Sequence, residues 1–80
     1  MKKVLMFSAA WCNPCRMSKP VFNQLKESKQ DYEYQIVDVD ENPIMATNFQ
    51  ISAVPTFIIM DEDREVSRIV GDVKKLEKML

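Results

Sequence analysis

The chain has 80 residues, of which 46% are hydrophobic and 29% charged, and its formal net charge is −1. This length suits one domain, and the hydrophobic content excludes an intrinsically disordered chain. The near-neutral charge supplies no basic field for nucleic acid, and no run approaches the ~20 apolar residues of a membrane span. We therefore expect residues 1–80 to form a single domain that binds neither nucleic acid nor membrane.

The N-terminus superficially imitates a secretory signal, with two lysines, a short apolar run over Val4–Phe7 and small residues up to Ala10. A signal core needs about 7–15 apolar residues, and this run ends at Ser8. Cleavage after Ala10 would also remove the first expected strand. The sequence therefore favours a cytoplasmic protein over a secreted one.

Apolar patterning predicts strands that alternate with helices. The expected strands are Lys3–Ser8, Tyr32–Val39, Thr56–Met60 and Glu65–Val70, and the expected helices run from Cys12 to Lys29, from Pro43 onward and after Asp72. A crossover through a long helix implies that the first two strands are parallel, and the late hairpin adds an antiparallel edge. The predicted order is β-α-β-α-β-β-α, an α/β fold.

Apolar side chains at spacings of three and four residues predict the buried face of each helix. The expected inward-facing residues are Met17, Val21, Phe22 and Leu25 in the first helix, Ile44, Met45 and Phe49 in the second, and Val73, Leu76, Met79 and Leu80 in the third. We expect Asn42 and Asp72 to cap the second and third helices, and Pro20 to kink the first.

Cys12 and Cys15 are the only cysteines, spaced C-x-x-C between the first strand and the long helix. At a helix start, unpaired backbone N–H groups and the helix dipole favour a thiolate, which makes a cysteine nucleophilic. Cys15, one turn further along and more deeply packed, is placed to attack a mixed disulfide formed at Cys12. The pattern predicts redox chemistry, with Cys12 as the exposed nucleophile and Cys15 as the resolving thiol.

Two other interpretations of this pair remain open from the residues alone. A zinc or iron–sulfur site needs about four ligands, and the chain has two cysteines and no histidine, so a dimer would have to share ligands. Chance spacing of two inert thiols is the second alternative. A C-x-x-C beside a βαβ pattern favours redox chemistry over both, and we expect no metal.

The segment Trp11-Cys12-Asn13-Pro14-Cys15 resembles the active-site signature of the thioredoxin family, in which the spacer is usually Gly-Pro. Four further segments resemble the family in chain order. Pro20 falls at the position of the family's helix-kinking proline, and Asp38–Pro43 is similar to its strand-exit segment. Val54-Pro55-Thr56 is similar to its cis-proline loop, and Gly71 to the glycine that ends its last strand. The family's first strand and helix have no counterpart. The resemblance therefore implies a trimmed thioredoxin-like fold of glutaredoxin-like size, a four-stranded mixed sheet in the order 2-1-3-4 with helices on both faces.

The resemblance also implies a function, a thiol-disulfide oxidoreductase that reduces protein disulfides and needs no cofactor beyond a redox-active Cys12–Cys15 disulfide. Its substrates would be disulfide-containing proteins, its electron donor a thioredoxin reductase-like flavoprotein, and the protein itself a monomer. Pro55 would be cis, so that the backbone of Val54 can pair with an extended substrate. The other substrate-binding residues that the resemblance implies are Trp11, Asn13, Pro14 and Gly71, with Asp72 beside them.

The chain departs from the family at a buried ion pair. The family's aspartate would fall at Met6 and its lysine partner at Ile36, so both members are apolar here, a change that a fold often tolerates. The group that usually takes the proton of the resolving thiol is then missing. Asp38, Asp40 or a water molecule would have to replace it.

Two other functions also remain open. A glutaredoxin-like enzyme reduced by glutathione would need basic and polar groups for the tripeptide, and Arg16 and Lys19 are available, but no second glycine follows Gly71. The other alternative is a thioredoxin-fold binding subunit whose cysteines take no part. A Cys12→Ser variant with full biological activity would favour that binding subunit.

Overall fold

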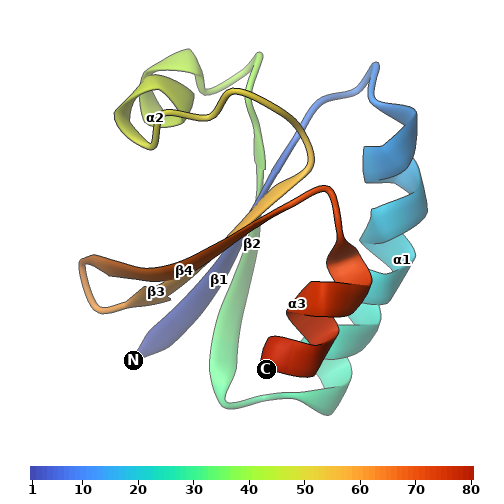
Figure 1. Ribbon diagram of the computed structural model, residues 1–80, viewed down its shortest axis with the longest axis vertical. Helices are drawn as coiled ribbons and strands as arrows, with labels where there is room; N and C mark the ends of the chain where they lie inside the picture. Colours follow the sequence, from blue (N-terminus) through green and yellow to red (C-terminus); the bar gives the residue numbers. More distant parts are fainter.

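The computed structural model describes residues 1–80. Its elements are β1 (Lys2–Ser8), α1 (Asn13–Ser28), β2 (Tyr32–Asp38), α2 (Pro43–Asn48), β3 (Thr56–Asp61), β4 (Arg64–Val70) and α3 (Val73–Met79). The predicted order of strands and helices is confirmed. Helices α1 and α3 lie together on one side of the sheet and α2 lies on the other (Figure 1). None of the helices combines the length and apolar composition that crossing a bilayer requires.

The strands form one sheet in the order β2-β1-β3-β4, which confirms the topology that the resemblance implies. Strand β1 is parallel to β2 and antiparallel to β3, and β3 and β4 form an antiparallel hairpin. Because β1 lies inside the sheet and is covered on both faces, its residues Val4–Phe7 are all apolar and all buried. The C-terminal end of β1 leads directly into the segment that carries the cysteines.

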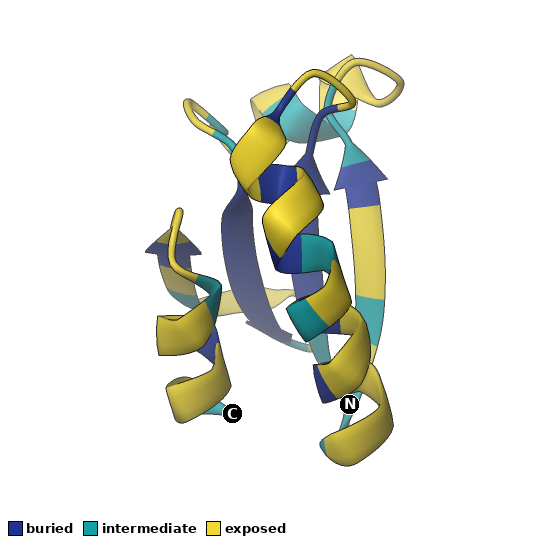
Figure 2. Ribbon diagram, turned by 90° about the vertical axis from the view of Figure 1, so that its right-hand side faces the viewer, coloured by how far each residue is buried: buried dark blue, intermediate teal, exposed yellow.

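Alternation of side chains along β1 divides the core into two layers. Val4 and Met6 face the α1 and α3 side, where they join a cluster that includes Phe22 of α1 and Leu76 of α3. Leu5 and Phe7 face the opposite side, where Met45 and Phe49 from the α2 region pack against them. Figure 2 shows the result for α1, whose outer surface is exposed and whose inner surface is buried.

The buried stripe of α1 differs from the predicted one. Met17 is 78% exposed, so its prediction as a core residue is wrong. Ser18 takes the inward position because its hydroxyl donates a hydrogen bond to the Pro14 carbonyl at 2.8 Å, which removes the cost of burying it. Pro20 lies within the helix, which continues beyond it. The residues that form the stripe are Cys15, Ser18, Phe22 and Leu25.

Three further apolar residues that were expected inside are at the surface. Ile44 is 77% exposed, because the short helix α2 turns only one face, with Met45, toward the sheet. Met79 is 43% exposed in the last turn of α3. Ile36 is 39% exposed, because β2 is an edge strand, so one half of the expected apolar pair is not buried.

The two predicted helix caps have different outcomes. Asp72 accepts hydrogen bonds from the backbone N–H groups of Lys74 and Lys75, both at 3.1 Å, so its prediction as the cap of α3 is confirmed. Asn42 occupies the corresponding position before α2, but its side chain makes no cap hydrogen bond. Its amide instead donates to the Asp38 carbonyl at 3.1 Å, which ties the start of α2 to the end of β2.

Candidate active site

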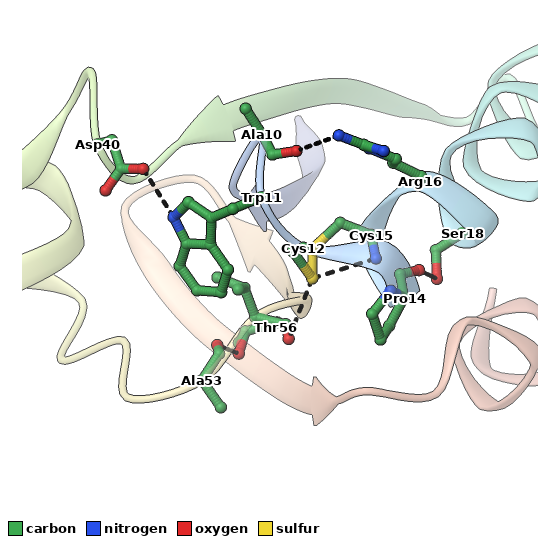
Figure 3. The surroundings of a disulfide bond; sticks show 11 residues. Ala10, Trp11, Cys12, Pro14, Cys15, Arg16, Ser18, Asp40, Ala53 and Thr56 are labelled. Atoms are coloured by element: carbon green, nitrogen blue, oxygen red, sulfur yellow. Dashed lines mark hydrogen bonds between the residues drawn. A yellow bond between two sulfur atoms is a disulfide. The ribbon is translucent and has the colours of Figure 1, made fainter.

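The cysteine pair lies where the chain leaves β1 and enters α1 (Figure 3). Cys12 is the N-cap of α1 with an extended backbone, φ −92° and ψ 109°, and its N–H donates to the Ala9 carbonyl at 3.2 Å. Pro14 lies in the first turn of the helix, where the N–H that proline lacks would be unpaired in any case. This local geometry brings the Cα atoms of Cys12 and Cys15 to 5.2 Å, and the two sulfur atoms form a disulfide.

Both sulfurs are shielded, although Cys12 is the more accessible residue. Cys12 is 4% exposed and Cys15 is 0% exposed, so the expectation of an exposed Cys12 is wrong for this oxidised state. The loop before β3 shields Cys12, since Cys12 Sγ lies 3.6 Å from the carbonyl oxygen of Val54. Burial of the resolving cysteine agrees with its deeper predicted position.

Cys12 Sγ accepts a hydrogen bond from the backbone N–H of Cys15 at 3.2 Å. This N–H is one of those that the start of a helix leaves without a backbone acceptor. A hydrogen bond strengthens when its acceptor carries a negative charge, so opening of the disulfide would stabilise a thiolate at Cys12. The arrangement favours Cys12 as the nucleophile.

The loop before β3 closes over the disulfide. The Val54–Pro55 peptide bond is cis, as the resemblance implies. Pro55 accepts a hydrogen bond from the Gly71 N–H at 2.8 Å, and Gly71 has a φ of +80°, a conformation that favours glycine. Thr56 holds the loop from the other side, its hydroxyl donating to the Ala53 carbonyl at 2.6 Å. The structure thus places Val54 against Cys12 and Gly71 beside Pro55, while their roles in substrate binding remain predictions.

Trp11 is 68% exposed, and its indole Nε1 donates to Asp40 Oδ2 at 2.9 Å. The hydrogen bond fixes a large aromatic side chain beside an open hollow of about 140 Å³. The hollow is mainly apolar, and the residues that line it are Trp11, Val39, Ile51, Ser52, Ala53 and Val54. Sequence reasoning missed Val39 and the loop residues 51–53, because an irregular loop has no periodic pattern and only proximity to Val54 marks them.

The remaining predicted groups lie around the start of α1. Asn13 and Pro14 are exposed next to Cys12. Arg16 folds back along the loop, and its guanidinium donates to the Ala10 carbonyl at 2.9 Å. The interaction braces the loop between β1 and α1 while leaving a positive charge near the disulfide.

The side of the disulfide that faces the core is apolar. Met6 is fully buried, and it belongs to the same packed cluster as Ala9 and both cysteines. The two acids considered as substitutes for the missing proton acceptor have other partners. Asp38 Oδ1 accepts from the backbone N–H groups of Asp40 and Glu41 at 2.8 and 3.2 Å, and the Asp40 carboxylate holds the Trp11 indole.

No group of three or more His, Cys, Asp or Glu side chains is arranged so that it could hold a metal ion. A zinc or iron–sulfur site at the cysteine pair would therefore need ligands from a second molecule. The surroundings of the disulfide are suited to thiol exchange, because Cys12 Sγ has a hydrogen-bond donor and contacts Val54, which lines an open apolar hollow.

Comparisons with known proteins agree with this geometry. The family model described as Thioredoxin matches residues 1–80. The chain is 41% identical over 76 residues to Thioredoxin H2 of Arabidopsis thaliana, covering 94% of this chain and 57% of that protein. It is 44% identical over 68 residues to Thioredoxin H5 of Oryza sativa subsp. japonica, covering 85% of this chain and 50% of that protein.

Solved structures show the same fold. The crystal structure of the thioredoxin NaTrxh from Nicotiana alata aligns with a TM-score of 0.94 at 37% identity, over 98% of this chain and 69% of that one. Oxidised mitochondrial thioredoxin 3 from Saccharomyces cerevisiae aligns with a TM-score of 0.92 at 33% identity, over 98% and 74%. The chain spans about half the length of the curated plant relatives. The family match, the relatives and the disulfide geometry together show that the chain belongs to the thioredoxin family.

Proposed function

We propose that the chain is a thiol-disulfide oxidoreductase that reduces protein disulfides through Cys12 and Cys15. The observation that carries the proposal is the disulfide at the start of α1, in which the Cys15 N–H donates to Cys12 Sγ. The sulfur that this donor would stabilise as a thiolate lies 3.6 Å from the carbonyl oxygen of Val54, a residue that lines the open hollow. The favoured nucleophile and the hollow that could receive a substrate are therefore joined through Val54.

The reaction takes two exchange steps. The Cys12 thiolate attacks one sulfur of a substrate disulfide, which forms a mixed disulfide and releases the other substrate sulfur as a thiolate. The Cys15 thiolate then attacks Cys12 Sγ, which forms the Cys12–Cys15 disulfide and releases the second substrate sulfur. Two electrons pass from the protein to the substrate, and the released thiolates take protons from the solvent.

The hollow beside Trp11 suits an apolar segment of a protein substrate. An exposed tryptophan that a hydrogen bond holds in place offers a large contact surface at low entropic cost. The backbone of Val54 lies at the rim of this hollow and against Cys12, where an extended peptide could pair with it. Asn13, Pro14 and Gly71 complete the proposed docking surface.

The electron donor that fits this function is a thioredoxin reductase-like flavoprotein. The similarity to plant thioredoxins supports that donor over glutathione. The working form that we propose is a cytoplasmic monomer in which residues 1–80 form one domain, with no cofactor beyond its own disulfide.

The experiment is a turnover assay with insulin as the disulfide substrate. NADPH with thioredoxin reductase should support reduction, and glutathione with glutathione reductase should support little or none. Cys12→Ser should lose nearly all activity, because the one remaining thiol, Cys15, is fully buried, whereas Ser67→Ala on the distant strand β4 should not change it. Full turnover by Cys12→Ser would overturn the proposal, and turnover only with glutathione would favour a glutaredoxin-like enzyme.

A further inference from the structure

Ser8, the last residue of β1, has an unusual hydroxyl. Its Oγ is the one buried side-chain nitrogen or oxygen in the chain with no hydrogen-bond partner among the protein atoms. The residue is 2% exposed, so the protein largely shields this hydroxyl from bulk solvent. A buried hydroxyl without a partner destabilises the state that contains it. The other two buried polar side chains, Ser18 and Thr56, both donate to carbonyl groups.

The position of Ser8 in β1 places its side chain on the sheet face that carries the cysteine-containing cluster. Side chains alternate along β1, so Ser8 shares the α1-facing side of the sheet with Met6. Met6, Ala9, Cys12 and Cys15 belong to one packed cluster, and Ser8 lies between the first two of these in the chain. The hydroxyl is therefore at the end of β1 from which the cysteine segment departs.

The neighbours of Ser8 offer its hydroxyl few partners. Met6, on the same face, offers only a thioether sulfur, which is a weak acceptor. Asp38 is the cross-strand neighbour of Ser8, but its Oδ1 accepts from the backbone N–H groups of Asp40 and Glu41. In the disulfide, neither cysteine sulfur carries a hydrogen to donate, and an uncharged sulfur is only a weak acceptor for the Ser8 O–H. The oxidised protein therefore leaves the Ser8 hydroxyl unpaired.

We infer that Ser8 is a positioning residue that shifts the Cys12–Cys15 equilibrium toward the dithiol. This inference rests on the proposed function and identifies a residue that shifts the redox potential of the cysteine pair. When the disulfide opens, Cys15 becomes a thiol that can donate to Ser8 Oγ, or a thiolate that can accept from its O–H. The hydroxyl gains a partner only in the reduced state, so it lowers the free energy of that state relative to the oxidised one.

The equilibrium is balanced in electrons and protons. An external dithiol gives two electrons and two protons to the Cys12–Cys15 disulfide, the Sγ–Sγ bond breaks, and the external dithiol becomes a disulfide. Ser8 exchanges no electron and forms no covalent bond. It changes only the relative free energies of the two forms, which makes the protein disulfide a stronger oxidant and the dithiol a weaker reductant.

The test is the equilibrium of the purified protein with dithiothreitol at neutral pH, for the wild-type protein, Ser8→Ala and Ser8→Thr. Ser8→Ala should favour the disulfide by about fivefold, which converts to about 20 mV toward a more negative potential. Ser8→Thr keeps a hydroxyl and should return most of the shift. Ser18→Ala is the matched control, because that buried hydroxyl donates to Pro14 without involving the sulfurs, and its potential should not move.

A second readout separates this role from a structural one. Ser8→Ala should stabilise the oxidised protein against unfolding more than it stabilises the reduced protein, by the free energy equivalent of the fivefold shift. An unchanged potential in Ser8→Ala, or equal stability changes in both redox states, would overturn the inference. Neither measurement uses a protein substrate, so a failure of the proposed function, seen as absent insulin reduction, stays distinguishable from a failure of this inference.

Discussion

Met6 is the residue at which this chain departs most clearly from its family. It is fully buried in the cluster that contains both cysteines, where the family has a carboxylate. A desolvated thiol disfavours its charged form, so deprotonation of Cys15 should limit the second exchange step. The rate of that step should therefore rise with pH well past neutrality.

Met6→Asp tests this interpretation. Burying a carboxyl group among apolar neighbours should lower the free energy of unfolding by about 1–3 kcal/mol. Burial also raises the pKa of the introduced carboxyl, so it becomes a suitable proton acceptor for Cys15. Stopped-flow measurement should show faster resolution of mixed disulfides near neutral pH, and Met6→Leu should leave the rate unchanged. An unchanged or slower rate in a folded Met6→Asp protein would mean that another group already serves as the base.

Among the helices and strands, the start of α3 depends on the Asp72 cap. Asp72 satisfies two backbone N–H groups that would otherwise lack protein acceptors. Asp72→Ala should lower the free energy of unfolding by about 1 kcal/mol. Asn42→Ala is the control, because Asn42 makes no cap hydrogen bond and its removal should cost less. Urea denaturation measures the free energy of unfolding of both variants. Equal losses of stability would refute this account of the caps.

The pair of Glu65 and Arg68 joins β4 to the loop after α2. Arg68 donates to both Glu65 oxygens at 2.8 Å and to the Phe49 carbonyl at 2.7 Å. The hydrogen bond from the Arg68 guanidinium holds the pKa of Glu65 below its ordinary value of 4.5. A lowered pKa in the folded state stabilises the protein above the unfolded pKa, and that stabilisation is lost as the pH falls through the folded value.

Glu65→Gln should therefore lower the free energy of unfolding at neutral pH by less than about 1 kcal/mol, because the pair is partly exposed to solvent. The gap between wild-type protein and variant should shrink as the pH falls below 4.5. Denaturation curves at a series of pH values measure that gap. A gap that stayed constant down to strongly acidic pH would contradict the assigned role of Glu65.

Elements were more predictable than the faces they bury. The buried run in β1 and the Asp72 cap each have a direct local signal, and both were correct. Met17 was assigned to the buried side of α1, a position that Ser18 occupies instead, because side-chain hydrophobicity does not reveal that a serine hydroxyl can pair with a carbonyl four residues earlier. Ile36 was misjudged because its exposure depends on strand order at the sheet edge, which no local pattern encodes.

The candidate site was predictable where chemistry depends on sequence spacing. Cys12, Cys15 and the cis Val54–Pro55 bond follow from short motifs. The hollow and the unpaired Ser8 hydroxyl depend on contacts between distant segments and on the absence of a partner, which a sequence does not display. The sequence therefore predicts the reacting sulfur atoms better than the surrounding groups that affect substrate binding and redox potential.

For the whole molecule, one architecture explains the position of the site. The sheet has a core layer on each face, and β1 leads into the start of α1 at the end of the sheet where the loop before β3 returns. The cysteines therefore combine a rigid support with an open hollow. A short chain can hold a reactive pair in this way because the fold supplies the helix start, the loop and the apolar floor together.

The central claim is that Cys12 attacks substrate disulfides and Cys15 resolves them. Its most direct test is trapping with Cys15→Ser, in which the second exchange step is blocked. Incubation with a disulfide-containing protein, followed by mass mapping, should yield a stable mixed disulfide at Cys12 that dithiothreitol releases. No adduct with Cys15→Ser, or an equally abundant adduct at Cys15 in Cys12→Ser, would contradict the account.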